Sequence, residues 1–463
     1  MKDMCTAAEL FRDVVVNLEQ AEHKLCILHG YESYPEEIAS DKDIDAISED
    51  PKQVARILHE SGVASLVQVW HPETGGTYRL HRLHRQCNGR PVFLVFDLLA
   101  DLGREGHLFL KGNELVRTCR RFRFFNVPSP ELEFACLLIR RLMKGSLDTA
   151  QGQRLSELYR QETTGCTKQL ARFLPWPEAD LVAVAARSGE WEPVRQRIER
   201  LRQALLGKVR RDQPLETLKY WLRYRLGRIR SRFEEFVRPP GLVVAFLGPD
   251  GAGKSTVADC VEQDLAPAFS SVRWYRSPLG HSSREWMQRY RWGRHLSETP
   301  RRDASVDGAL VHHNEPPRGL LLSLFKLGSW WIYTLRSYVT DVRPLIVNHA
   351  MVIFDRHFWD LLVYPKHFRY GGPIWLARFV GRFVPHPDLV ILLDAPAEVI
   401  QGRKQEVPFQ ETARQREGYL KVVERLSNAH VVDASKSLDK VVGETERIIL
   451  GYMADRTTGR LKI

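Results

Sequence analysis

Residues 248–256, GPDGAGKST, constrain the fold of this 463-residue chain more than any other stretch. They match the pattern G-x-x-x-x-G-K-[ST] of a phosphate-binding loop. An apolar run of strand length, residues 242–247, precedes the loop, and residues 256–265 after it have helical periodicity. Strand, glycine loop and helix in this order are the context that the motif requires, and they predict a parallel α/β sheet.

The residue types of the loop explain how it would hold a phosphate. Glycines let backbone N–H groups converge on phosphate oxygens without a Cβ in the way, and the start of the helix adds partial positive charge. Lys254 would reach the β- and γ-phosphates of ATP, and the Ser255 hydroxyl would bind Mg²⁺. The alternative is a glycine-rich turn before an ordinary helix. The residues expected to bind the cofactor are Gly248, Gly251, Gly253, Lys254, Ser255 and Thr256.

The composition, 43% hydrophobic and 27% charged, predicts a soluble globular chain of two or three domains. Its seven cysteines show no C-x-x-C spacing, which argues against a disulfide framework or a zinc site and favours a reducing, cytoplasmic location. No apolar run reaches membrane-spanning length. The closest, residues 320–333, contains Lys326 and is expected to be a buried helix, with an interfacial membrane helix as the alternative.

Residues 1–128 contain three aspartates on expected strands. Asp43 and Asp45 alternate with apolar residues on one strand, so both point to the same face, and Asp97 ends another strand, residues 92–96. Three carboxylates that converge from neighbouring strands would hold one or two Mg²⁺ ions. The alternative is a solvated strand edge with a capping aspartate.

A glycine at position 30, the D-x-D pair and the later strand aspartate together resemble the nucleotidyltransferase fold. The resemblance covers about the first hundred residues, and it implies an α+β domain with metal-binding Asp43, Asp45 and Asp97. That family usually has a second small residue straight after the first glycine. Here Gly30 is followed by Tyr31, a bulky side chain expected to crowd a triphosphate.

The apolar pattern of residues 129–238 predicts a helical subdomain. It ends in a basic linker that precedes the domain at 239–463. Between Arg195 and Arg232 the chain carries 13 basic and three acidic residues, which accounts for +10 of its net charge of +11. In the last linker helix, basic residues interleave with aromatic ones. Such a helix could contact nucleic acid or an anionic membrane surface; we favour the alternative, a solvated helix whose aromatics pack against a neighbouring domain.

Beyond the loop, strand and helix patterns alternate through residues 239–463. One apolar strand, residues 351–354, ends in Asp355 and Arg356, at the edge where parallel sheets place their ligand groups. Asp355 would hold Mg²⁺ through water, and Arg356 would clamp a phosphoryl oxygen of the acceptor. A structural ion pair is the alternative for these two residues.

This half resembles the thymidylate kinase family of nucleoside monophosphate kinases. The loop at 248–256, the triplet DRH at 355–357, and LDAP at 393–396 with a following Arg-Lys carry the resemblance, and an insertion is expected at 277–317. The resemblance implies that Asp250 contacts the acceptor sugar. It also implies that Asp355 and Arg356 contact the metal and the acceptor phosphate, and that two arginines of a lid close on ATP. The catalytic residues implied are Lys254, Asp355, Arg356, Asp250, Arg403 and Arg414.

The expected fold class is therefore α/β: a C-terminal P-loop kinase with a parallel sheet flanked by helices, an N-terminal α+β nucleotidyltransferase-like domain, and a helical linker. The expected function is ATP- and Mg²⁺-dependent phosphoryl transfer to a nucleotide or another small acceptor. Two alternatives stay open, namely a sugar or glycan kinase in surface-polysaccharide biosynthesis, by analogy, and an ATP-gated binding module without turnover. A homodimer is also left open.

Overall fold

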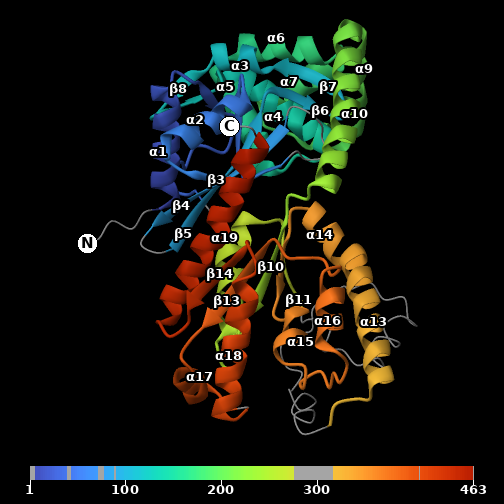
Figure 1. Ribbon diagram of the computed structural model, residues 1–463. Coiled ribbons are helices and arrows are strands. Elements are labelled where there is room, and N and C mark those ends of the chain that lie inside the picture. The colour runs from blue at the N-terminus through green and yellow to red at the C-terminus, as the bar shows by residue number, and fades with distance from the viewer. Residues whose placement is uncertain are drawn as a thin grey trace. The chain divides into compact units, whose positions relative to one another are not determined.

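The computed structural model describes residues 6–38, 43–70, 78–87, 90–275, 316–405 and 407–461. The chain divides into an N-terminal unit, Met1–Glu234 with Leu450–Ile463, and a C-terminal unit, Glu235–Ile449 (Figure 1). The expected boundary at 238/239 lies close to this division. Residues 450–463, expected in the kinase domain, belong to the N-terminal unit, because the last helix continues into it. Nearly all of the expected insertion lies outside the described residues.

A seven-stranded mixed sheet with the order β3-β4-β5-β2-β1-β9-β8 forms the centre of the N-terminal unit. Strands β2 and β5 run parallel, and Asp45 lies directly opposite Asp97. A separate hairpin, β6–β7, accompanies the sheet. The strands are β1 (Leu25–Ile27), β2 (Asp43–Ser48), β3 (Ser65–Trp70), β4 (Tyr78–Cys87), β5 (Arg90–Leu99), β6 (Asp101–Arg104), β7 (His107–Lys111), β8 (Arg120–Phe122) and β9 (Phe125–Val127).

Two hydrophobic cores cover the two faces of this sheet. In one core, helices α1 and α2 pack on sheet residues such as Ile44 and Phe96. In the other, the helices from α3 through α9 pack on sheet residues such as Ile47 and Leu99. The expected helical subdomain thus packs in the same unit as the sheet. The helices are α1 (Ala7–Gln20), α2 (Pro51–Ser61), α3 (Gly112–Arg117), α4 (Pro130–Lys144), α5 (Thr149–Gln161), α6 (Thr163–Phe173), α7 (Glu178–Ser188), α8 (Glu192–Gln196), α9 (Ile198–Asp212) and α10 (Pro214–Val237).

The C-terminal unit contains a five-stranded sheet in which every pair is parallel, with the order β11-β12-β10-β13-β14. This confirms the predicted parallel α/β sheet. Its central strand β10 is buried along all six residues, since sheet neighbours and helices cover both faces. The strands are β10 (Leu242–Leu247), β11 (Val272–Tyr275), β12 (Met351–Phe354), β13 (Leu389–Asp394) and β14 (Ala429–Asp433).

Helices of the C-terminal unit follow the strands in alternation, as Figure 1 shows. Two of them, α13 and the π-helical turn after it, fill the stretch expected to be helical between β11 and β12. The helices are α11 (Lys254–Leu265), η1 (Ala266–Ala268), α13 (Leu320–Ser337), η5 (Tyr338–Val342), α14 (Arg343–Val347), α15 (Trp359–Val363), α16 (Ile374–Gly381), α17 (Ala397–Arg403), α18 (Phe409–Val423) and α19 (Leu438–Leu461).

The prediction of a buried helix at residues 320–333 is wrong in one respect, because α13 is exposed on part of its surface. Leu327 and Trp330 pack into the core of the C-terminal unit, whereas Leu321 and Phe325 are 82% and 75% exposed. The helix is apolar around most of its circumference, yet within the described ranges one stripe of it is buried. Among the described residues, no helix is long and apolar enough to cross a membrane.

Candidate active site

The phosphate loop connects β10 to α11 at the carboxyl edge of the parallel sheet. Gly248, Gly251 and Gly253 have φ angles of +143°, +93° and +90°, a region that residues with a Cβ rarely adopt. A Cβ on Gly248 would lie 2.7 Å from the carbonyl oxygen of Leu393 on the neighbouring strand. The predicted strand–loop–helix context is therefore present, and the glycines are required by backbone geometry.

Lys254, the first residue of α11, turns its side chain back over the loop. Its Nζ donates hydrogen bonds to the carbonyl oxygens of Gly248 (2.7 Å) and Pro249 (3.0 Å), and it lies 3.5 Å from a carboxylate oxygen of Asp250. The side chain is only 8% exposed. A buried ammonium group is thus held directly above the backbone that would surround a phosphate.

Asp250 in the loop and Arg356 after β12 form a close ion pair, 2.7 Å from Nη2 to Oδ1. Burial opposes ionisation of Asp250, but Lys254 and Arg356 together hold its pKa well below the usual range. Burial also opposes the charge on Arg356, while Asp250 and Asp360 raise its pKa. The structure therefore joins two predicted site residues from different elements into one charged cluster.

Asp355, at the end of β12, offers a carboxylate oxygen for a ligand. The residue is 6% exposed, and its Oδ1 has no hydrogen-bond partner. Ser255 and Thr256 at the start of α11 are exposed. A buried, unpartnered carboxylate oxygen costs free energy unless a cation or water meets it, so this residue fits the role of a Mg²⁺ ligand, direct or through water.

A buried network that the sequence did not reveal lies behind Arg356. The Tyr419 hydroxyl donates a 2.5 Å hydrogen bond to Asp360 Oδ1, and the backbone N–H of His357 donates to Oδ2 at 2.7 Å. Burial raises the pKa of Asp360, although Arg356 opposes the shift. Because these partners come from α15 and α18, 59 residues apart, no local pattern could have indicated the pair.

The predicted lid arginines have protein partners in this structure. Arg403 at the end of α17 donates to the carbonyl oxygen of Ala434 (2.9 Å), and Arg414 pairs with Glu411 and remains half exposed. A third arginine, Arg416, makes a two-pronged ion pair with Asp394 at 2.7 and 2.8 Å. The sequence does not distinguish these roles, since all three residues are arginines on neighbouring helices.

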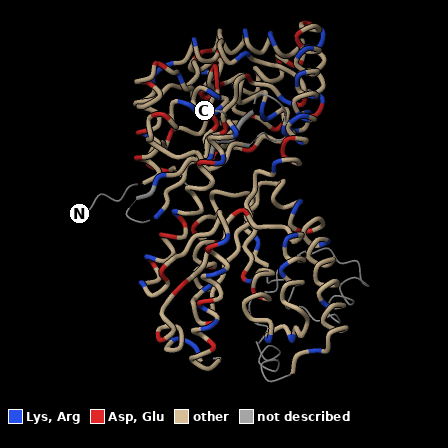
Figure 2. Tube along the Cα trace, viewed as in Figure 1, with Lys and Arg blue, Asp and Glu red and all other residues tan. Residues whose placement is uncertain are grey.

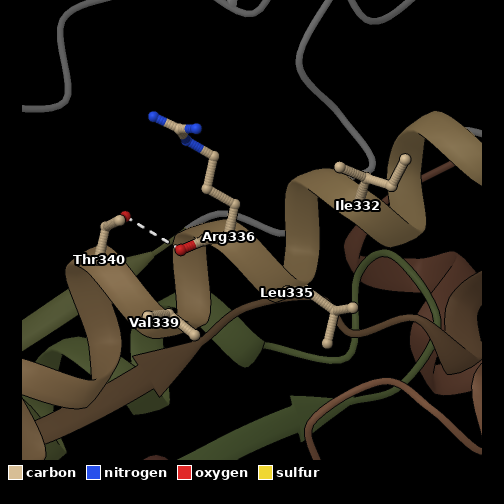
Figure 3. Close-up of a pocket in the computed structure, with 5 residues that line it drawn as sticks. All are labelled: Ile332, Leu335, Arg336, Val339 and Thr340. Atoms are coloured by element: carbon tan, nitrogen blue, oxygen red, sulfur yellow. Dashed lines mark hydrogen bonds between the residues drawn. The ribbon is translucent and has the colours of Figure 1, made fainter.

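One hollow in the C-terminal unit lies apart from this cluster. It has a volume of about 480 Å³ and includes none of the phosphate-loop residues (Figure 3). Its position on the exposed face of α13 separates it from the candidate chemistry. The residues that line it are Ile332, Leu335, Arg336, Val339 and Thr340.

In the N-terminal unit, the carboxylate of Asp45 already has two side-chain neighbours, the ring of His29 and the guanidinium of Arg140. His29 Nε2 lies 3.0 Å from one carboxylate oxygen, and Arg140 Nη2 lies 2.9 Å from the other. Burial opposes its ionisation, yet these neighbours hold the pKa of Asp45 well below its ordinary value. Asp43 is exposed and Asp97 is buried. Within the described ranges no group of three or more His, Cys, Asp or Glu is arranged to hold a metal ion, so the three-carboxylate site stays a prediction.

Tyr31, expected to crowd the loop at Gly30, points into the protein instead. It is 1% exposed, and its hydroxyl donates a 2.6 Å hydrogen bond to the buried carboxylate of Glu133. Arg154 donates to both partners, at 3.1 Å to Tyr31 and 2.7 Å to Glu133. This network holds the Tyr31 ring in the interior of the N-terminal unit.

These features define a parallel α/β domain with a phosphate loop, a buried lysine and an Asp-Arg pair at the edge of its sheet. No family model matches the chain. A thymidylate kinase of Xanthomonas oryzae pv. oryzae is 27% identical over 230 residues, which cover 48% of this chain and 89% of that protein. A probable thymidylate kinase of Thermococcus gammatolerans is 28% identical over 222 residues, which cover 45% of this chain and 98% of its own length.

Among solved structures, the thymidylate kinase of Ehrlichia chaffeensis covers 45% of this chain and 98% of itself, at 17% identity and a TM-score of 0.31. That score supports no further conclusion. The curated relatives support a thymidylate kinase-like domain in this chain and its assignment as an ATP-dependent kinase. They extend over less than half of the chain and do not bear on a nucleotidyltransferase domain.

Proposed function

We propose that the C-terminal unit transfers the γ-phosphoryl group of ATP to a nucleoside monophosphate. The observation that supports this proposal is the cluster of Lys254, Asp250 and Arg356. In this cluster a carboxylate of the phosphate loop pairs with the arginine that follows strand β12. The curated relatives are themselves named thymidylate kinases, which favours a nucleotide acceptor over a sugar.

Each residue of the cluster has a part in positioning charge. Lys254 would exchange its two backbone carbonyl partners for the β- and γ-phosphate oxygens, which are stronger acceptors because they are charged. Arg356, held in place by Asp250, would bind the acceptor phosphate. Mg²⁺, when bound, supplies charge neutralisation between the phosphates. Asp355 and Ser255 are the residues that would hold it, and the rate enhancement would come mainly from positioning.

Lys254→Ala tests this proposal against Lys440→Ala, a control at an exposed lysine on α19. Both variants and the wild type are assayed for transfer of labelled phosphate from ATP to nucleoside monophosphates and to sugars. We expect Lys254→Ala to lower turnover by at least ~10²-fold, as removal of a transition-state donor does, and Lys440→Ala to leave it unchanged. Equal turnover in the two variants would refute the proposal, and transfer to sugars alone would refute its acceptor.

For the N-terminal unit we propose nucleotidyl transfer as a second activity, supported by the pairing of Asp45 with Asp97 on adjacent parallel strands. Asp43→Ala, at an exposed position, should abolish Mg²⁺-dependent incorporation of label from α-labelled nucleoside triphosphates without lowering the melting temperature. Incorporation that survives in Asp43→Ala would exclude this carboxylate from the reaction.

A further inference from the structure

Helix α10 presents an apolar stripe that no other described part of the N-terminal unit covers. Tyr220 is the one buried residue of its 24. The large apolar residues at its other positions recur every three or four residues, which places them on one face of the helix. They are 45–71% exposed, and they are Leu215, Leu218, Leu222, Leu226, Ile229 and Phe233.

The charges of α10 are sorted around this stripe. On a helical projection basic residues border both of its sides, and the side chains of Lys219, Arg223 and Arg230 are 62–80% exposed. Glu216 and Glu234 lie farther from the stripe and pair with two of these basic residues, at 3.8 Å from Lys219 and 2.7 Å from Arg230. The third acidic residue of the helix, Glu235, lies on the side opposite the stripe. Figure 2 shows the distribution of charged residues along the chain. The remaining basic residues of the helix are Arg225, Arg228 and Arg232.

The opposite face of α10 is the one that meets the protein. Tyr220 lies so close to the β6–β7 hairpin that a Cβ on Gly103 would come within 2.1 Å of its hydroxyl oxygen. Trp221 lies equally close to Gly106, since a Cβ on that glycine would come within 2.8 Å of Trp221 Cδ1. The expected packing of the linker aromatics is therefore present for these two residues. It fixes which face of the helix turns outward.

We propose that α10 lies on an anionic membrane surface, with its apolar stripe in the headgroup–acyl boundary and its arginines against lipid phosphates. An apolar face between two basic borders is the arrangement of helices that bind in the plane of a membrane. A second copy of the chain fits less well, because pairing two such stripes would bring like charges together along both borders. Duplex nucleic acid presents its charged phosphate backbone on the outside and would leave the apolar stripe uncovered.

The test is flotation of the full chain with vesicles of phosphatidylcholine alone and with vesicles containing about one third phosphatidylglycerol, at about 0.15 M salt. The wild type should float with the anionic vesicles at least ~10-fold better than with the neutral ones. Ile229→Asn with Phe233→Asn should reduce that binding by ~10-fold or more. Arg223→Gln with Arg230→Gln should reduce it by about 30-fold.

Val184→Asn is the matched control, since Val184 is an exposed apolar residue of α7 (51%) away from the stripe. It should float as the wild type does. The proposal is overturned if the wild type does not float, if the stripe variant floats unchanged, or if neutral vesicles bind equally well. Light scattering of each variant without vesicles adds a further check. A wild-type dimer that the stripe variant dissociates, without flotation, would assign the stripe to a second copy instead.

Discussion

Asp355 and Arg356 follow each other in the sequence but have opposite surroundings. Arg356 is paired with Asp250 through Nη2, whereas Asp355 keeps a buried oxygen without a hydrogen-bond partner. A carboxylate in that state is poised to gain more from a cation than an exposed one, because water does not already solvate it.

Asp355→Asn should therefore weaken metal dependence more than nucleotide binding. We expect the Mg²⁺ concentration for half-maximal turnover to rise by ~10–100-fold, while binding of ATP measured without Mg²⁺ changes little. A Mg²⁺ titration of the initial rate measures the effect. An unchanged titration midpoint would show that Asp355 does not contact the metal or its water shell.

His357, the next residue, gives the fold a dependence on pH. Burial lowers its pKa to about 4, whereas in the unfolded chain it is ~6.5. The unfolded chain then binds more protons between these values, so stability falls as the pH falls through this window. About 2 kcal/mol should be lost between about pH 7 and pH 5.

His357→Phe should remove this loss, because phenylalanine keeps a ring beside Trp359 and takes up no proton. Denaturant unfolding at both pH values measures it. His84 in the N-terminal unit is also buried, with a pKa lowered to about 4. Since both proteins contain His84, the contribution of His357 is the difference between the stability losses of the wild type and the variant. If the variant loses as much stability as the wild type, another group carries the effect.

At the scale of elements, local patterns predicted the phosphate loop, its flanking strand and helix, and the parallel sheet. Those features rest on short-range signals, namely glycines that need positive φ and apolar runs of strand length. The pairing of Asp360 with Tyr419 was missed, since it depends on how α15 and α18 approach each other. The exposed face of α13 was missed because apolar periodicity does not reveal which stripe finds a partner.

Two glycines allow a matched test of the loop. Gly248→Ala places a Cβ at a φ of +143° and 2.7 Å from Leu393 O, which should cost about 1–3 kcal/mol and disturb the loop. Gly402→Ala on α17 meets nothing within 4 Å and should instead be neutral or stabilise by ~0.5–1 kcal/mol. Melting temperatures measure both. Equal shifts would mean that backbone geometry does not determine the need for glycine in the loop.

At the scale of the whole molecule, α19 contributes to both units. Residues up to Ile449 belong to the C-terminal unit and those from Leu450 to the N-terminal one. Near the end of the helix, the Thr457 hydroxyl donates a 2.8 Å hydrogen bond to the carbonyl oxygen of Val67 on β3. Leu461 packs against the core formed by α1 and α2.

Thr457→Val should lower the unfolding free energy of the N-terminal unit by about 0.5–1.5 kcal/mol, because the buried carbonyl of Val67 loses its donor. Thr458→Val is the control, since that hydroxyl bonds back to Ala454 within its own helix. Calorimetry that resolves the two units measures the effect. A destabilisation that is equal in both variants would mean that the bond to Val67 adds nothing.

The shared helix also sets an order of events during synthesis. A ribosome synthesises residues 6–234 before residues 450–461, so the N-terminal unit lacks this segment until the C-terminal unit, residues 235–449, has been translated. A product that stops within the kinase domain would leave the surface around Val67 uncovered, and quality-control proteases could recognise it there. The N-terminal unit would then be complete only in products that also contain the C-terminal unit.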